Sequence, residues 1–190
     1  MMTLPILLAA LLALPRPKPP PAQTSATEQQ DLSDDQIQAR VHAYLGDIDG
    51  RIGADQWKAL GPRAGSLLQS IALDPAQLPS RRAKAAYCLA LAAPDQAEPV
   101  LTTLAQDESA ASTVRIAAMQ GMARIVAPAV AARKLSKVLR SARDPGVRSV
   151  AAEVVAASGN SGCAQVKAQV DREPPVQRNA FSRALARCGE

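Results

Sequence analysis

Apolar positions in the second half of the chain follow a helical spacing that recurs. Between Asp144 and Gly159 the apolar residues fall at i, i+3 and i+4, as on one face of a helix. Asp144 suits the N-cap, Pro145 the first turn, and Gly159 a left-handed cap at the end. A helix of about 14 residues that buries mostly Ala and Val is not stable alone, so it must stack on others.

Copies of this segment are present along the chain. Arg148 has counterparts at Arg82, Arg115 and Arg178, at separations of 33, 33 and 30 residues. A large apolar residue follows each arginine by seven positions and an alanine by eight, and a shorter apolar segment precedes each copy. A two-helix unit of this length, present four times, is typical of an α-solenoid.

The pattern and its Pro and Gly breaks predict an all-α chain with four helical hairpins. The expected helices cover 62–72, 80–93, 95–106, 111–126, 129–142, 145–158, 161–171 and 175–188. Residues 31–61 resemble an atypical terminal unit, with a capping box at Ser33 and Gln36 and an apolar helical stripe after it. Trp57 is expected to pack under the first repeat, with a ligand platform as the lesser alternative.

Three short sequence segments resemble the HEAT-repeat family, in particular its short bacterial HEAT-like type. They are Asp144-Pro145-Gly146-Val147-Arg148 with Ala151-Ala152, Ser112-Thr113-Val114-Arg115 with Ala117-Ala118, and Ala59-Leu60-Gly61-Pro62 leading into Leu67-Leu68. The resemblance extends over about residues 60–189, and the last copy is three residues short. It implies a right-handed stack of helical hairpins that binds proteins and is sometimes part of an enzyme.

Residues 1–26 differ in kind from the rest. An apolar run from Leu4 to Leu14 is followed by a proline-rich tract. The run is too short to span a bilayer and suits the core of a secretory signal, although no Lys or Arg precedes it. We expect a cleaved leader and a periplasmic or secreted protein, with an uncleaved anchor or a disordered tail as alternatives. No membrane-spanning segment is expected beyond this leader. The predicted organisation is leader 1–26, cap 27–61 and repeat domain 62–190.

Composition argues against most enzymatic chemistry. His42 is the single histidine, and the three cysteines show no zinc-type spacing. Asp47-Ile48-Asp49-Gly50 resembles the middle of a calcium loop, but Leu45 and Gln56 stand where two outer ligands belong, so we interpret it as a turn. The sequence contains no glycine-rich phosphate loop. We therefore expect no catalytic residue, cofactor or metal.

The cysteines have a structural interpretation. Cys163 near the start of one helix and Cys188 near the end of its antiparallel partner are a candidate disulfide that would staple the last hairpin outside the cytoplasm. Cys88 is expected to be a small core residue. The repeated arginines at 82, 115, 148 and 178 are expected to be structural, each reaching a helix end or an acid of a neighbouring repeat.

Charge is the one feature that suggests a binding surface. Residues 27–110 carry 7 basic and 12 acidic residues, and residues 111–190 carry 13 and 5. Arg133, Lys137 and Arg140 share one helical face and are the candidate partner-binding residues. The alternative is a solvated outer face that keeps the solenoid soluble.

These observations predict an exported, non-enzymatic scaffold that binds a protein partner, with an acidic protein as one candidate. Nucleic acid is not expected, since the few aromatic residues form no stacking platform. The alternative is an accessory subunit or lyase-like HEAT-repeat protein that holds a small ligand. That alternative requires a cleft with polar groups near Arg82 and Arg115.

Overall fold

The computed structural model describes residues 32–47 and 52–189. Contacts divide the chain between Asp31 and Leu32, and every described residue belongs to the unit that begins at Leu32. The leader over residues 1–26 lies outside the described residues, as do the central positions of the calcium-like segment, residues 48–51.

The described part of the chain is all-α, which confirms the predicted fold class. Its helices are α1 (Asp34–Gly46), α2 (Ala54–Lys58), α3 (Pro62–Leu73), α4 (Pro79–Ala92), α5 (Pro94–Gln106), α6 (Ser112–Ile125), α7 (Pro128–Ser141), α8 (Pro145–Ala156), α9 (Asn160–Val170) and α10 (Pro175–Ala186), followed by the short 3₁₀ helix η1 (Arg187–Gly189). The eight helices expected from the repeats all form, with ends within two residues of the predicted positions. No helix among these residues is long and apolar enough to cross a membrane.

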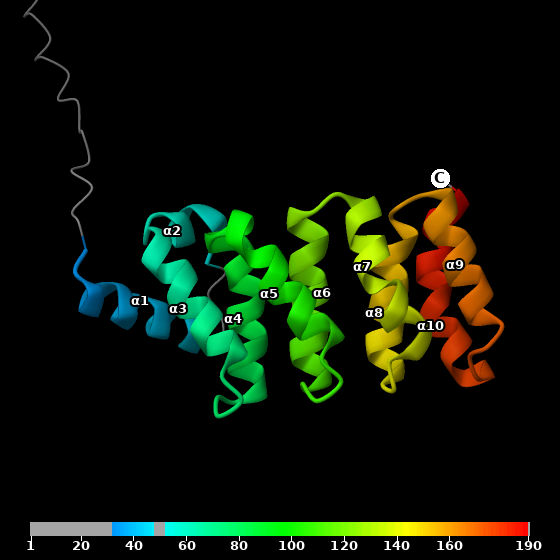
Figure 1. Cartoon of the computed structure of the whole chain (residues 1–190), viewed down its shortest axis with the longest axis horizontal. Coiled ribbons are helices and arrows are strands. Elements are labelled where there is room, and N and C mark those ends of the chain that lie inside the picture. The colour runs from blue at the N-terminus through cyan, green and yellow to red at the C-terminus, as the bar shows by residue number, and fades with distance from the viewer. Residues whose placement is uncertain (1–31, 48–51, 190) are drawn as a thin grey trace, which may run out of the picture. The chain divides into compact units, whose positions relative to one another are not determined.

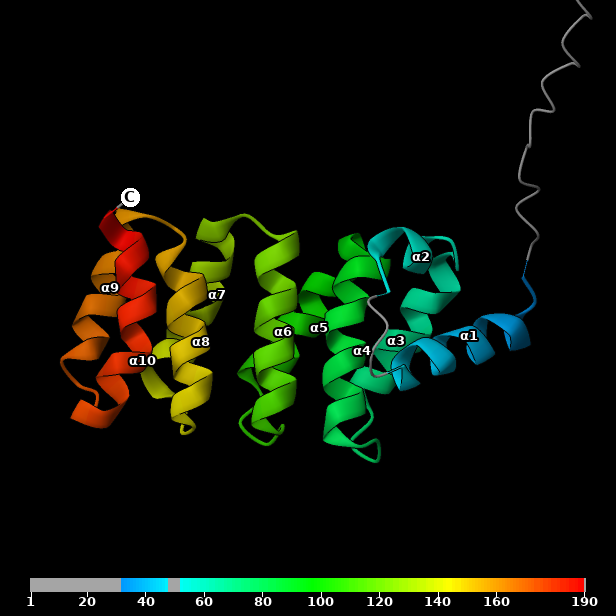
Figure 2. The ribbon, with the colours of Figure 1, turned by 180° about the vertical axis from the view of Figure 1, so that it is seen from behind.

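The repeat helices form two layers (Figures 1 and 2). The first helices of the hairpins, α3, α5, α7 and α9, contact one another in order and make up the first-helix layer. The second helices, α4, α6, α8 and α10, do the same and make up the second-helix layer. The contacts of each helix are therefore with its own hairpin and the adjacent ones, as in a solenoid.

Small side chains fill the core between the layers, because alanine and valine occupy most buried positions. At the N-terminal end α1 and α2 pack on the first hairpin. Trp57 is fully buried, and its ring meets the edge of Tyr44 with the centroids 5.3 Å apart. The packing interpretation of Trp57 is confirmed. The predicted capping box of Ser33 and Gln36 also forms at the start of α1.

Helix ends explain where the hairpins turn. The Asp144 carboxylate accepts a hydrogen bond from the Val147 N–H at 2.9 Å, so this N-cap is as predicted. Gly159 has a positive φ of 79°, but α8 already ends at Ala156, and Gly159 is the residue before α9 rather than the cap of α8. At Gly162 an added Cβ would lie 1.9 Å from the Val155 carbonyl oxygen, so only glycine allows α9 to begin this close to α8.

The four repeated arginines make the same kind of hydrogen bond in every hairpin. Each donates to a backbone carbonyl at or just after the end of the first helix in its own hairpin. The acceptors are Ala72 for Arg82 (3.0 Å), Ala105 for Arg115 (3.2 Å), Ala142 for Arg148 (2.6 Å) and Glu173 for Arg178 (3.0 Å). Carbonyls at helix ends lack a partner within the helix, so these bonds satisfy them. The structural interpretation of these arginines is confirmed.

Arg148 also joins the third hairpin to the fourth. Its Nε and Nη2 atoms donate to the two carboxylate oxygens of Glu173 at 2.7 and 2.6 Å. Only 2% of the Glu173 side chain is exposed, and Gln169 donates to the same carboxylate at 2.8 Å. Hydrogen bonding from Arg148 holds the pKa of Glu173 below its usual range, and the same bonds raise the pKa of Arg148.

Replacing Arg148 by Ala should lower the free energy of unfolding by about 3–5 kcal/mol, because it leaves the Glu173 carboxylate buried without its partner. Urea unfolding followed by circular dichroism measures this loss. Arg172→Ala is the matched control, since Arg172 is exposed and its side chain makes no hydrogen bond or ion pair with the described residues. Equal losses in the two variants would contradict the role assigned to Arg148.

The same pair gives stability a pH dependence. Since the pKa of Glu173 is lower in the folded chain, its contribution is complete above its unfolded pKa and is lost as pH falls through the folded value. Unfolding at pH values from about 6 down to about 3 should show a smaller acid-induced loss in Glu173→Gln than in the unchanged protein. An identical pH dependence in both would show that Glu173 contributes nothing.

The last hairpin is closed by a covalent link. Cys163 in α9 and Cys188 in η1 form a disulfide, with their Cα atoms 5.7 Å apart and a separation of 25 positions in sequence. The last hairpin packs on the third hairpin alone, so this link restrains a hairpin with one neighbouring hairpin.

Changing both Cys163 and Cys188 to Ser should lower the free energy of unfolding by about 3 kcal/mol, as expected for a loop of this length. Thermal unfolding of the variant and of the oxidised protein measures the difference. Dithiothreitol should lower the midpoint of the unchanged protein and leave that of the double variant in place. A midpoint insensitive to reductant in the unchanged protein would contradict a bonded pair.

Candidate binding groove

Two adjoining cavities lie on the second-helix layer. One of about 640 Å³ lies between α4, α6 and α8, and one of about 490 Å³ lies between α2, α4 and α6. Both are lined by Tyr87 of α4 and Arg124 of α6, so the two cavities adjoin at this pair. We call the two together the second-helix groove. Their volumes fall in the range of ligand sites, and both cavities are open to solvent.

The repeat register explains which residues line this groove. Seven of the lining residues stand five or nine positions after a repeated arginine, and residues four apart lie on one helix face. The fifth positions that line the groove are Tyr87, Gln120 and Glu153, and the ninth positions are Leu91, Arg124, Ala157 and Arg187. The sequence therefore held a signal for this site, namely the offset from the arginines.

The centre of the groove is a stacked pair. The guanidinium carbon of Arg124 lies 5.7 Å from the centroid of the Tyr87 ring. Arg124 is exposed and forms no ion pair with the described residues, nor does Arg187. Glu153, the acidic residue of the lining, already has Arg183 at 3.6 Å. The charges in this lining that lack an opposite partner are therefore positive.

The cavity beside α2 is mainly apolar. Trp57, Leu91 and Cys88 contribute to its wall, and Lys84 at its edge donates to the Asp47 carbonyl. Burial raises the pKa of the Cys88 thiol to about 11. The thiol therefore stays protonated at neutral pH and has little nucleophilic character. This agrees with the interpretation of Cys88 as a core residue.

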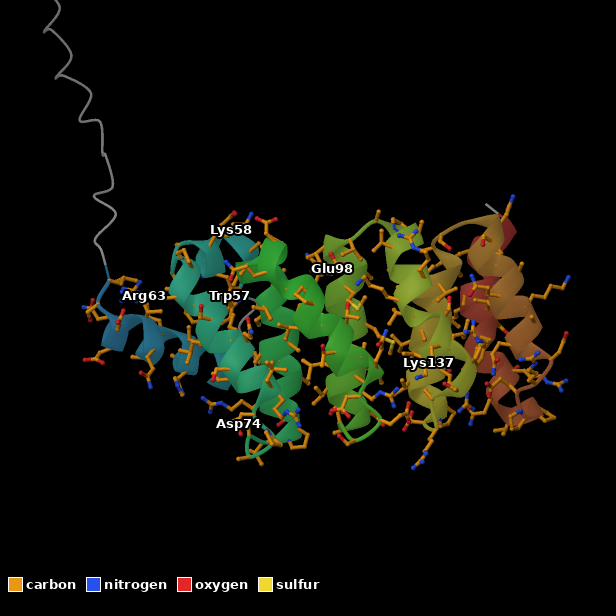
Figure 3. The ribbon with its side chains drawn as sticks, viewed as in Figure 1. Trp57, Lys58, Arg63, Asp74, Glu98 and Lys137 are labelled. Atoms are coloured by element: carbon orange, nitrogen blue, oxygen red, sulfur yellow. A yellow bond between two sulfur atoms is a disulfide. The ribbon has the colours of Figure 1, made fainter. Side chains whose placement is uncertain are left out.

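The basic residues singled out by the sequence lie elsewhere. Arg133, Lys137 and Arg140 project from α7 in the first-helix layer, and none of them lines the groove. All three are exposed and make no ion pair with the described residues, whereas the adjacent Lys134 pairs with Glu98 at 3.1 Å. Figure 3 labels Lys137 on this part of the stack. The sequence therefore led to a different surface from the second-helix groove.

Other candidate positions offer little chemistry. Arg82 and Arg115 line neither cavity, because their side chains are directed to the helix-end carbonyls. His42 lies beside the Arg81 guanidinium on the exposed side of α1. Within residues 32–47 and 52–189, no cluster of three His, Cys, Asp or Glu side chains is placed to hold a metal ion.

Comparison with known proteins agrees with this geometry. A family model for HEAT repeats matches residues 65–156. This part of the chain belongs to the HEAT-repeat family. The HEAT-repeat segment begins in α3 and ends with α8, so it contains the three hairpins whose second helices form most of the groove. HEAT repeats commonly mediate contacts between proteins. No curated protein and no solved structure matches the chain significantly.

Proposed function

We propose that this protein is a non-enzymatic scaffold outside the cytoplasm that binds a protein partner in the second-helix groove. The observation that carries the proposal is the groove itself, which extends over three consecutive HEAT-repeat hairpins. A binding surface built across repeats is how solenoids usually reach extended partners.

The variation of the groove lining from repeat to repeat favours recognition of one specific partner. The position seven residues after each arginine is a large apolar residue in every repeat, with Leu89, Met122, Val155 and Leu185, and the first three of these side chains are buried. The fifth positions that line the groove change from repeat to repeat, with Tyr87, Gln120 and Glu153. Constant positions maintain the stack, and the varied ones give each hairpin a different contact to offer.

Two features support the location outside the cytoplasm. The apolar run and proline-rich tract of residues 1–26 have the composition of an export signal. The bond between Cys163 and Cys188 belongs to an oxidising compartment, since cytosolic thiols are normally kept reduced.

The small-ligand alternative has less support. It requires polar groups that converge near Arg82 and Arg115, and both guanidinium groups are instead bonded to carbonyls of α3 and α5. The groove also lacks a histidine and a thiol of lowered pKa, the groups that most often start acid, base or nucleophilic catalysis.

The proposal is tested by affinity capture from envelope and cytosolic fractions, with the full chain tagged at its C-terminus. Arg124→Glu should weaken capture of a specific envelope protein by at least about 30-fold, the effect of losing one central contact. The matched control is the triple change of Arg133, Lys137 and Arg140 to Glu, which should retain the partner.

Each other result is informative. Loss of the partner only in the triple variant would place binding on α7 and contradict the groove. Recovery of cytosolic proteins or nucleic acid alone would contradict the location. Circular dichroism of both variants verifies that each remains folded.

A further inference from the structure

The second-helix groove differs in chemistry between its two ends, and this bears on the kind of segment it takes. We infer that the partner contributes an acidic segment with a large apolar side chain, the carboxylate meeting Arg124 and the apolar group entering the cavity beside α2. The inference rests on the proposed function and specifies the chemistry of its partner.

The acidic group of the inferred segment follows from the charges of the groove lining. Among the described residues of the lining, the charged ones are Lys84, Arg124, Arg187 and Glu153, and Glu153 alone of these is acidic. Its carboxylate already has Arg183, so it has little to offer a basic segment. Arg124 has no ion-pair partner among the described residues, and the Tyr87 ring supports it from one face. A bidentate carboxylate is the group that matches those donors best.

The apolar side chain of the inferred segment follows from the shape and polarity of the cavity beside α2. In the cavity of about 490 Å³ beside α2, the partly exposed apolar side chains are Ile52, Tyr87 and Leu91, with the buried Trp57 and Cys88 behind them. None of the described residues in its lining is acidic. An apolar side chain placed there removes apolar surface from water on both partners. The larger cavity next to it is bounded by small residues, including Ala123, Val150 and Ala157, which leave room for the main chain of the segment.

A purely anionic polymer fits less well. Such a polymer gains nothing from the apolar cavity, and its attraction follows the density of basic charge. Among the described helices, α7 has the most basic residues, namely Arg133, Lys134, Lys137 and Arg140, and it carries no acidic residue. A nucleic acid or an anionic polysaccharide should therefore prefer α7, which makes the two cases separable by mutation.

The experiment selects binders to the immobilised full chain from a library of random dodecapeptides displayed on phage. The recovered peptides should be rich in Asp and Glu and should share a large apolar residue. Selected peptides are then synthesised, each with a version in which Gln replaces Glu and Asn replaces Asp, and another in which Ala replaces the apolar residue. Either replacement should weaken binding by about tenfold or more.

Protein variants locate the binding site. The double variant Arg124→Gln with Arg187→Gln should weaken binding of the selected peptides by about tenfold or more, and Leu91→Glu should do so by filling the apolar cavity with a like charge. The matched control, Lys137→Gln with Arg140→Gln, removes the same number of charges from α7 and should bind as the unchanged protein does. Arg124→Lys keeps the charge without the planar donors and should be intermediate.

The outcomes separate the inference from the proposed function. Neutral or basic peptides that depend on Arg124 would overturn the acidic segment and leave the groove as a protein-binding site. The inference would be overturned if the α7 control variant alone lost binding of the selected peptides. It would also be overturned if the phage selection enriched no peptide above background. A separate result would contradict the proposed function: the Arg124→Glu variant would still capture the envelope partner.

Discussion

The arrangement of this protein depends on a hydrogen bond repeated four times, from an arginine side chain to a carbonyl at or just after the end of the preceding helix. A core of alanine and valine has few features that set how one helix lies on the next. The arginine supplies such a feature, because its guanidinium must reach a carbonyl that has no partner within its own helix. Since this bond orients the second helix, it also decides which later positions face the groove.

The sequence was sufficient for the helices and for these arginines, because both follow from local chemistry. Proline and Asp144 mark helix starts, and a spacing of about 33 residues identifies equivalent positions. Gly159 shows the limit of local reasoning: its positive φ was expected, yet it serves the helix that follows it rather than the one before. The turn between α8 and α9 depends on how closely Gly162 approaches Val155, which no pattern within one helix reveals.

The groove was missed for a different reason. Charged residues such as Lys137 are conspicuous in a sequence, and their clustering on α7 led to the outer surface. The groove is lined by residues that look unrelated, since Tyr87, Gln120 and Glu153 share only their distance from an arginine. Whether they share a surface depends on the packing of α4, α6 and α8, and that is a tertiary property. The basic face of α7 and the second-helix groove are thus two separate surfaces of this protein.

If the arginine register directs a recognition surface onto the second-helix layer, binding should change the exchange of that layer alone. Hydrogen–deuterium exchange of the full chain is measured with and without a saturating selected peptide. We expect slower exchange in α4, α6 and α8 and unchanged exchange in α7, because binding stabilises the helices that it contacts. Protection confined to α7 and α9 would contradict binding in the second-helix groove and would place the binding site on the basic face of α7.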